Sequence, residues 1–221
     1  MDTKAFIAEF VGTFALIFVG VGAIAADYMT SGASGLVGVA LAHGLVIAVM
    51  VSATGAISGG HLNPAVTIGA LVGKKIAGGK ALMYIVAQCL GAIVAALLIK
   101  LAVPAETLNS VNMGTPTLGI GITQTQGLVT EIVLTFFLVF VVYGTAIDAR
   151  APKVGGLFIG LTVALDILMG GPITGAAMNP ARHLGPAVMG GGLEDLWLYW
   201  VGPIIGGIIA GFVYHNTLEE K

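Results

Sequence analysis

Two short stretches place the same polar residues at matching points of a very apolar chain. Residues 58–67 read SGGHLNPAVT and residues 174–183 read TGAAMNPARH, so each holds one Asn-Pro-Ala triplet. Asn is a favoured N-cap residue and Pro is favoured at the first position of a helix, so each triplet predicts the start of a helix. The residues before the triplets, 58–62 and 174–178, are rich in Gly and small side chains and predict irregular backbone.

The chemistry that these stretches offer is hydrogen bonding and charge repulsion. A helix N-terminus carries about half a positive charge, and Asn63 and Asn179 add amide donors beside it. If both N-termini face one point of a cavity, they repel cations and orient a neutral hydrogen-bonding molecule. A water that accepts from both amides points its own hydrogens outward, which interrupts a proton-conducting chain.

Catalytic, metal and nucleic-acid chemistry are not expected. The histidines are scattered, with no metal-ligand spacing such as HExxH, so we predict no enzyme, no metal and no cofactor. A net charge of −2 provides no basic field for a nucleic-acid partner. The single cysteine, Cys89, cannot form an internal disulfide.

The composition is that of an integral membrane protein. Hydrophobic residues make up 57% of the 221 residues and charged residues 9%, against about 25% charged residues in soluble domains. Six apolar runs have spanning length, at roughly 5–26, 35–56, 80–103, 127–147, 154–170 and 196–214. Two further segments, about 63–72 and 179–189, begin at the triplets and are too short to cross about 30 Å of hydrocarbon.

The basic residues predict the orientation in the membrane. With a cytoplasmic N-terminus, only Lys100 and Arg182 lie towards the outside, and an even number of spans places both termini in the cytoplasm. The short termini without a targeting segment favour the cell (plasma or inner) membrane. The residues expected on the cytoplasmic side are Lys4, Lys74, Lys75, Lys80, Arg150, Lys153 and Lys221.

The chain also repeats itself. EFVGTFALIFVGVG (9–22) matches EIVLTFFLVFVVYG (131–144) at eight positions, and the two triplets follow at corresponding places. Each half holds three spans, an odd number, so the second half enters the membrane from the opposite side as an inverted repeat. We therefore predict one all-α membrane domain over 1–221, with repeats of about 1–103 and 127–221 and a linker over 104–126. The two short helices then meet N-terminus to N-terminus near the midplane.

These features resemble the aquaporin (major intrinsic protein) family. The motifs AEFVGTF, SGGHLNPAVT, GAAMNPAR and YWVGP occur in the family's order, with Arg182 directly after the second triplet. The resemblance implies a right-handed bundle of six transmembrane helices plus two re-entrant half-helices. It also implies an hourglass pore in each subunit, a homotetramer, and passive flux without a cofactor. Asn63, Pro64, Ala65, Asn179, Pro180 and Ala181 are the family's paired motif residues in this chain.

Three polar residues within the predicted spans need partners inside the bilayer. Glu9 and Glu131 are equivalent in the repeat, and Gln88 lies in the third span. The carboxylates could form a proton relay in a transporter, or accept hydrogen bonds from the irregular backbone before each half-helix. Their symmetric placement, and the family's use of such residues, favour half-helix support, with Gln88 in a similar role.

The resemblance also maps a selectivity filter onto the chain. Arg182 would donate to the permeant and repel cations, and the other filter positions fall on His43, Ile167 and Ala176. Common bacterial water channels carry Phe in place of His43 and His in place of Ile167. The set found here resembles plant tonoplast-type aquaporins, several of which pass ammonia as well as water.

Several functions remain open for such a pore. The first is a water channel that also passes ammonia, with hydrogen peroxide as a further candidate, and the second is a plain water channel. A glycerol facilitator is disfavoured because His183 stands where that branch has Asp. A secondary transporter also uses inverted repeats, but the sequence offers little from which to build a coupling-ion site.

Three further polar residues have no settled role in the sequence. His61 is expected at the cytoplasmic pore mouth, and His183 at the outer mouth, where it could make flux depend on pH. Asp166 lies late in the fifth span and could pair near Gly170 and Gly171 or reach the pore mouth.

Overall fold

Six long helices form the framework of the protein. The computed structural model describes residues 2–152 and 154–220, and within these ranges the regular structure is helical. The predicted spans agree with helices of membrane-crossing length to within a few residues. These helices are α1 (Thr3–Met29), α2 (Gly35–Ser58), α4 (Gly78–Ala102), α6 (Gln124–Val142), α7 (Gly155–Thr174) and α9 (Leu196–Val213). Single π-helical turns continue α6 to Ile147 and α9 to Leu218.

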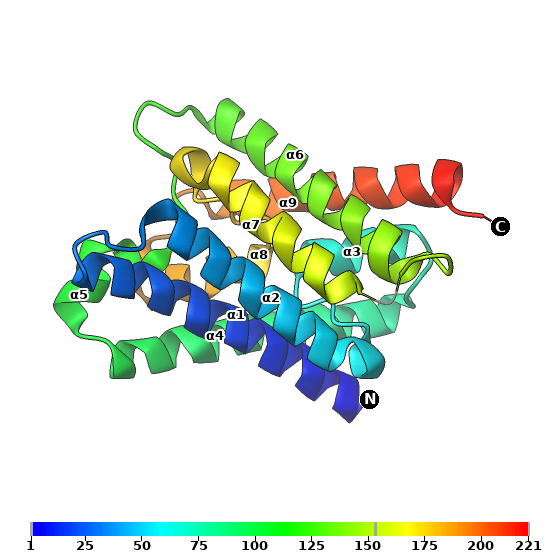
Figure 1. The fold of residues 1–221 in the computed structure, drawn as a ribbon, viewed down its shortest axis with the longest axis horizontal. Helices are drawn as coiled ribbons and strands as arrows, with labels where there is room; N and C mark the ends of the chain where they lie inside the picture. Colours follow the sequence, from blue (N-terminus) through cyan, green and yellow to red (C-terminus); the bar gives the residue numbers. More distant parts are fainter. Residues whose placement is uncertain (1, 153, 221) are drawn as a thin grey trace.

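Two short helices begin at the Asn-Pro-Ala triplets. They are α3 (Pro64–Val72) and α8 (Pro180–Pro186), and a π-helical turn over Ala187–Gly191 follows α8. In Figure 1, α3 lies towards the end of the bundle where both termini lie, and α8 lies on the other side of the middle, towards the end that carries α5 (Ala105–Ser110). The two short helices therefore approach the middle of the bundle from opposite ends.

The connection between the halves contains short helical turns. The stretch 104–126, expected as the linker between the repeats, holds α5 and a 3₁₀ turn over Asn112–Gly114, and α6 begins at Gln124. This segment also folds back over the pore, as described below. Lys153 and Lys221, which were expected on the cytoplasmic side, lie outside the described residues.

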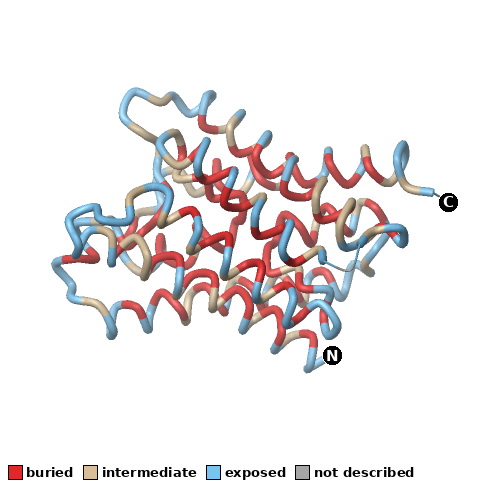
Figure 2. The backbone as a smooth tube through the Cα atoms, viewed as in Figure 1, coloured by how far each residue is buried: buried red, intermediate tan, exposed pale blue. Residues whose placement is uncertain are grey.

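The two halves meet where α2 crosses α7. A Cβ atom at Gly44 would lie 2.6 Å from the carbonyl oxygen of Gly160, so only hydrogen fits at this crossing. Close packing of this kind through small residues is a common way for membrane helices to associate. Figure 2 shows that burial follows the inward side of each long helix, while the outward side is exposed. Exposed apolar side chains such as Leu82, Val86 and Phe212 suit contact with lipid.

Candidate functional site: a pore between two re-entrant helices

Each long helix that precedes a half-helix ends in the left-handed conformation. Gly59 follows α2 with φ 93° and Gly175 follows α7 with φ 76°. Ser58 and Thr174 were expected in the irregular segments, but they are the last helical residues, so the irregular backbone covers 59–62 and 175–178. Glycine carries no Cβ penalty at positive φ, which explains why both chain reversals begin at glycine.

Glu9 accepts hydrogen bonds from the first irregular segment. Its carboxylate is fully buried and accepts from the backbone N–H groups of His61 (2.9 Å) and Leu62 (2.6 Å). The hydroxyl of Ser58 (2.6 Å) and the amide of Gln88 (2.7 Å) donate to the same carboxylate. Both oxygens of Glu9 thus have two donors each, and the carboxylate is held in place.

Glu131 makes the corresponding contacts in the second half. It is fully buried and accepts from the N–H groups of Ala177 (2.9 Å) and Met178 (2.7 Å) and from the hydroxyl of Thr174 (2.7 Å). Tyr199 donates its hydroxyl to the carbonyl of Thr174, at 2.8 Å. In the first half, Tyr84 donates to the carbonyl of Ser58 in the same way, at 2.6 Å. The irregular segments are therefore anchored by equivalent residues.

The two asparagines cap their own helices and bridge to the opposite segment. The Oδ1 of Asn63 accepts from the N–H of Ala65 (2.8 Å), and the Oδ1 of Asn179 accepts from those of Ala181 (3.0 Å) and Arg182 (3.2 Å). The Nδ2 of Asn63 donates to the carbonyl of Met178 (2.8 Å), and that of Asn179 donates to the carbonyl of Leu62 (3.0 Å). One N–H of each amide is used in this bridge, so a single N–H per amide remains for a molecule in the pore. Pro64 and Pro180 occupy the first helical positions, and Ala65 and Ala181 are fully buried.

A narrow cavity runs past both asparagines. Its volume is about 40 Å³, and since one water needs roughly 10–15 Å³ measured in this way, it has room for a few waters. Most of the lining is apolar, and the polar groups are few. The filter candidates His43, Ile167, Ala176 and Arg182 all line it, together with His61, Asn63 and Asn179.

The central cavity opens into a wider space at each end. The vestibule on the α5 side has a volume of about 290 Å³ and shares three lining residues with the central cavity, namely His43, Ile167 and Arg182. The vestibule on the side of the termini measures about 310 Å³ and shares Gly60, His61, Val66, Val142 and Ile159. Because His43, Ile167 and Arg182 border both a wide and a narrow space, they mark a constriction.

The polar groups at this constriction are oriented by backbone carbonyls. Arg182 is 4% exposed and its Nη1 donates to the carbonyl of Gly114, at 2.9 Å. The Nδ1 of His43 lies 2.8 Å from the carbonyl of Val39, so it carries the proton and leaves Nε2 as an acceptor. The Nε2 atom is buried and has no partner among the described residues. The role of Gly114 was not predicted, because a backbone carbonyl 68 positions away leaves no signal in the sequence.

The remaining candidates occupy different environments. His61 lines both the central cavity and the vestibule on the termini side, with its Nδ1 3.1 Å from the hydroxyl of Thr67. His183 was expected at the outer pore mouth, but it is 2% exposed and stacks on Tyr199 with ring centres 4.1 Å apart. Among the described residues, it lines neither the central cavity nor the vestibule on the α5 side.

Asp166 is also buried, with 6% exposure, and is absent from the described lining of the central cavity and both vestibules. Its Oδ2 has no hydrogen-bond partner among the described residues.

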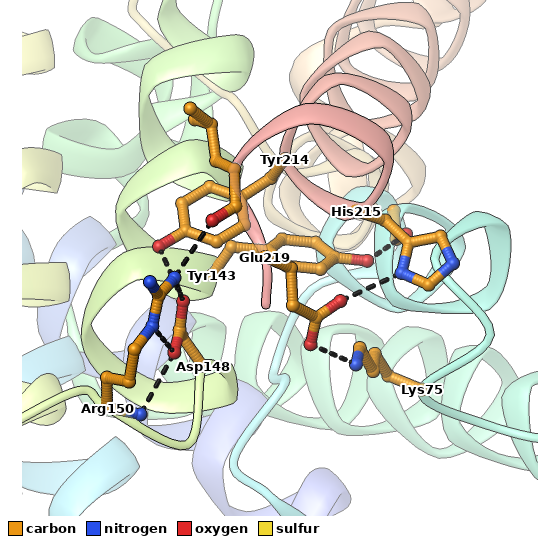
Figure 3. A network of polar contacts seen from close by, with 9 residues as sticks. Lys75, Tyr143, Asp148, Arg150, Tyr214, His215 and Glu219 are labelled. Carbon is orange, nitrogen blue, oxygen red and sulfur yellow. Dashed lines mark hydrogen bonds and ion pairs between the residues drawn. The ribbon is translucent and has the colours of Figure 1, made fainter. Parts of the chain in front are cut away.

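A charged network borders the vestibule on the termini side (Figure 3). Lys75 lines that vestibule and pairs with Glu219, whose other oxygen lies 2.8 Å from the Nδ1 of His215. Arg150 pairs with Asp148 at 2.9 and 2.5 Å. Hydrogen bonds from Arg150 hold the pKa of Asp148 well below its usual range, and those from Lys75 and His215 lower the pKa of Glu219. The network thus fastens the C-terminal turn beside the mouth of the pore.

These features together define a class of protein. Six membrane-length helices enclose a narrow, mostly apolar cavity between two wider spaces, which is the geometry of a membrane channel. The chain belongs to the major intrinsic protein family, whose model matches residues 1–214. Members of this family are channels, so the chain is not an enzyme.

The most similar relatives include plant aquaporins. The chain is 46% identical to a "Probable aquaporin TIP-type" of Antirrhinum majus, over 97% of this chain and 87% of the relative. It is 45% identical to "Aquaporin TIP4-4" of Zea mays, over 99% and 88%. Among solved structures, the aquaglyceroporin from Plasmodium falciparum matches with a TM-score of 0.84 and 28% identity, covering 99% of this chain and 97% of that one.

Proposed function

We propose that this channel conducts water and ammonia passively and excludes ions and protons. The observation that carries the proposal is the constriction shared by the central cavity and the α5-side vestibule, where Arg182 and His43 face Ile167. A buried guanidinium repels cations. Ile167 and Ala176 add no hydrogen-bonding side chain, so a small neutral molecule passes without having to match a dense set of polar groups. The plant relatives named as TIP-type aquaporins support water as the main permeant.

We assign the remaining site residues to supporting roles on the same geometry. Glu9, Glu131 and Gln88 hold the irregular segments so that carbonyl groups and the two helix N-termini face the pore. The paired N-termini and the amides of Asn63 and Asn179 orient water at the midpoint, and this orientation opposes proton transfer. His61 borders the vestibule on the termini side, which we propose is cytoplasmic. Hydrogen peroxide is a further small permeant to test.

The proposed orientation places both termini in the cytoplasm. Basic residues gather at the termini end, where Lys75 pairs with Glu219, Lys80 lies 3.7 Å from Asp2, and Arg150 lies 3.1 Å from Glu220. Such an excess of Lys and Arg is typical of cytoplasmic loops. Localisation to the cell membrane remains a prediction from the sequence.

The proposed architecture consists of two inverted repeats, about 1–103 and 127–221, fused through 104–126. Equivalent anchors in the two halves, Glu9 with Tyr84 and Glu131 with Tyr199, support this division. We further propose a homotetramer with one pore per subunit. The apolar outward faces of α2 and α7, which include Leu41, Leu45 and Leu161, offer the surface for such an assembly.

Small polyols are a second candidate permeant because the structural relative from Plasmodium falciparum is named an aquaglyceroporin. The narrow central cavity, with room for a few waters, favours water over a three-carbon polyol.

The ammonia proposal is tested by exchanging two filter residues. Proteoliposomes with the wild-type protein and with the variant H43F/I167H are compared for water flux and for ammonia entry, the latter reported by an internal pH dye. We expect the variant to keep its water flux and to lose the ammonia flux. The exchange places an aromatic ring with a hydrogen-bond donor at position 167, where the wild type has an aliphatic side chain. Unchanged ammonia flux would refute this function for the filter.

A further inference from the structure

The imidazole of His43 packs edge-on against a glycine of a neighbouring helix. A Cβ atom added to Gly20 of α1 would meet the ring of His43, with Nε2 nearest, Cδ2 at 2.8 Å and Cε1 at 3.0 Å. Cβ atoms in proteins essentially never come within 3.0 Å of another heavy atom in this way. Gly20 therefore forms a recess in α1 that receives the Nε2 edge of the ring.

The ring has little freedom to move elsewhere. Its Nδ1 is bonded to the carbonyl of Val39. The next residue on α2, Gly44, is in close contact with α7, since a Cβ atom there would lie 2.6 Å from the carbonyl oxygen of Gly160. The backbone of α2 cannot move away from α1 without losing its contacts with α1 or clashing with α7. The open space beside His43 is the pore that it lines with Ile167 and Arg182.

The corresponding position in the other half is not small. Matching Glu9 with Glu131 places Val142 at the position of Gly20, and matching Asn63 with Asn179 places Ile159 at the position of His43. Val142 and Ile159 both line the junction between the central cavity and the vestibule on the termini side. At this pair of equivalent positions, the end on the termini side has two branched side chains, whereas the filter end has the ring of His43 beside Gly20.

We propose that Gly20 is a positioning residue for the constriction and acts through His43. The recess sets how far the imidazole projects towards Ile167 and Arg182, and so sets the width of the constriction. This inference rests on the proposed function in one respect: the permeant is taken to pass through the constriction. A side chain at position 20 pushes the ring into the path and narrows it.

The test compares Gly20→Ala with a matched change on the same helix. A Cβ atom at Gly22 would lie 3.8 Å from the Cδ1 of Ile99, which is an ordinary contact, so Gly22→Ala is the control. We expect G20A to lower water and ammonia flux about tenfold, a size in keeping with the energetic cost of overpacking. G22A should conduct like the wild type. Fluxes are normalised to the amount of folded protein in the proteoliposomes.

A second variant separates positioning from a general effect on folding. Removing the ring removes the clash, so G20A/H43A should conduct like H43A. If G20A slows flux equally in the H43A background, Gly20 acts on the helix rather than on the ring, and the proposal is overturned. Wild-type flux in G20A overturns it as well.

A readout that needs no flux is the ¹⁵N resonance of His43 Nδ1, assigned by its absence in H43A. It should shift in G20A, because the ring moves relative to the carbonyl of Val39, and stay in place in G22A. An unshifted resonance in G20A contradicts the proposal. If the wild type passes water but not ammonia, the ammonia proposal fails while the water flux and the resonance still test Gly20.

Discussion

Glu9 and Glu131 show how single residues make an irregular segment possible within a membrane. Backbone N–H groups at membrane depth need acceptors, and each carboxylate accepts from two of them and from a neighbouring hydroxyl. A charged acceptor forms stronger hydrogen bonds than a neutral one. The loops keep their left-handed residues, such as Leu62 with φ 52°, because these bonds hold them.

The first residue-scale prediction concerns Glu131→Gln. The amide keeps the size of the side chain but presents an NH₂ group either to the N–H of Met178 or to both the N–H of Ala177 and the hydroxyl of Thr174. A buried donor left without a partner costs about 1–3 kcal/mol, so we expect a lower unfolding temperature in detergent and reduced water flux. Thermal unfolding followed by tryptophan fluorescence measures the former. The exposed Glu194→Gln is the control, and equal stability of the two variants would contradict the account.

The second residue-scale prediction concerns Arg182→Val. The change removes the guanidinium from the constriction and leaves the carbonyl of Gly114 without its donor. We expect faster entry of methylamine and glycerol and a measurable leak of monovalent cations, because both bulk and positive charge are lost. Lys100→Ala is the control, since Lys100 is exposed, donates to the carbonyl of Met189 and is not among the described lining residues of the central cavity or the α5-side vestibule. Unchanged solute and cation selectivity in R182V would count against Arg182 as a filter residue.

Helices were predictable where the signal is local. Spans follow from runs of apolar residues, and α3 and α8 follow from the capping chemistry of Asn63 and Asn179, whose side chains do accept from backbone N–H groups. Features that depend on distant partners were not predictable. The helix α5 lay in a polar stretch interpreted as a linker, and the burial of His183 depends on stacking with Tyr199.

The element-scale prediction is that Asn63→Ala loosens both half-helices. The variant loses the cap of α3, worth about 1 kcal/mol, and the bridge to the carbonyl of Met178 at the base of α8. We expect a drop in thermal stability larger than that of a cap alone, together with slower water flux. Thr123→Ala is a suitable control, because the exposed side chain of Thr123 caps α6 by accepting from the N–H of Gln126. A loss no greater than that of T123A would show that the bridge contributes nothing.

At the scale of the whole molecule, charge lies mainly at the ends and the pore between them is narrow and mostly apolar. The network around Asp148 and Glu219 joins the C-terminal turn to the loops at Lys75 and Arg150 (Figure 3). This joins the last helix to distant parts of the chain beside one vestibule. The network is therefore a feature of overall stability rather than of the filter.

The corresponding prediction is a loss of stability in acid. The pKa values of Asp148 and Glu219 are lower in the folded protein than their usual values of about 4. Groups with a depressed pKa stabilise the fold above the unfolded pKa, and this contribution is lost as the pH falls towards the folded pKa. We expect the unfolding temperature of the wild type to decrease when the pH is lowered below about 4. Asp148→Asn should lower the unfolding temperature at neutral pH and make its decrease in acid smaller.

Glu220→Gln is the control for that experiment, since Glu220 is an exposed partner of the same Arg150. It should leave the neutral stability and the pH dependence unchanged. A pH profile of D148N that parallels that of the wild type would contradict the role of Asp148.

The most direct test of the central claim is stopped-flow light scattering on proteoliposomes of the purified protein. Vesicles are shocked with an impermeant osmolyte, and ammonia entry is followed in parallel by an internal pH dye. The account predicts fast water flux with a low activation energy and ammonia entry faster than in protein-free vesicles. Water flux no faster than in protein-free vesicles, or rapid glycerol entry with slow water, would contradict it.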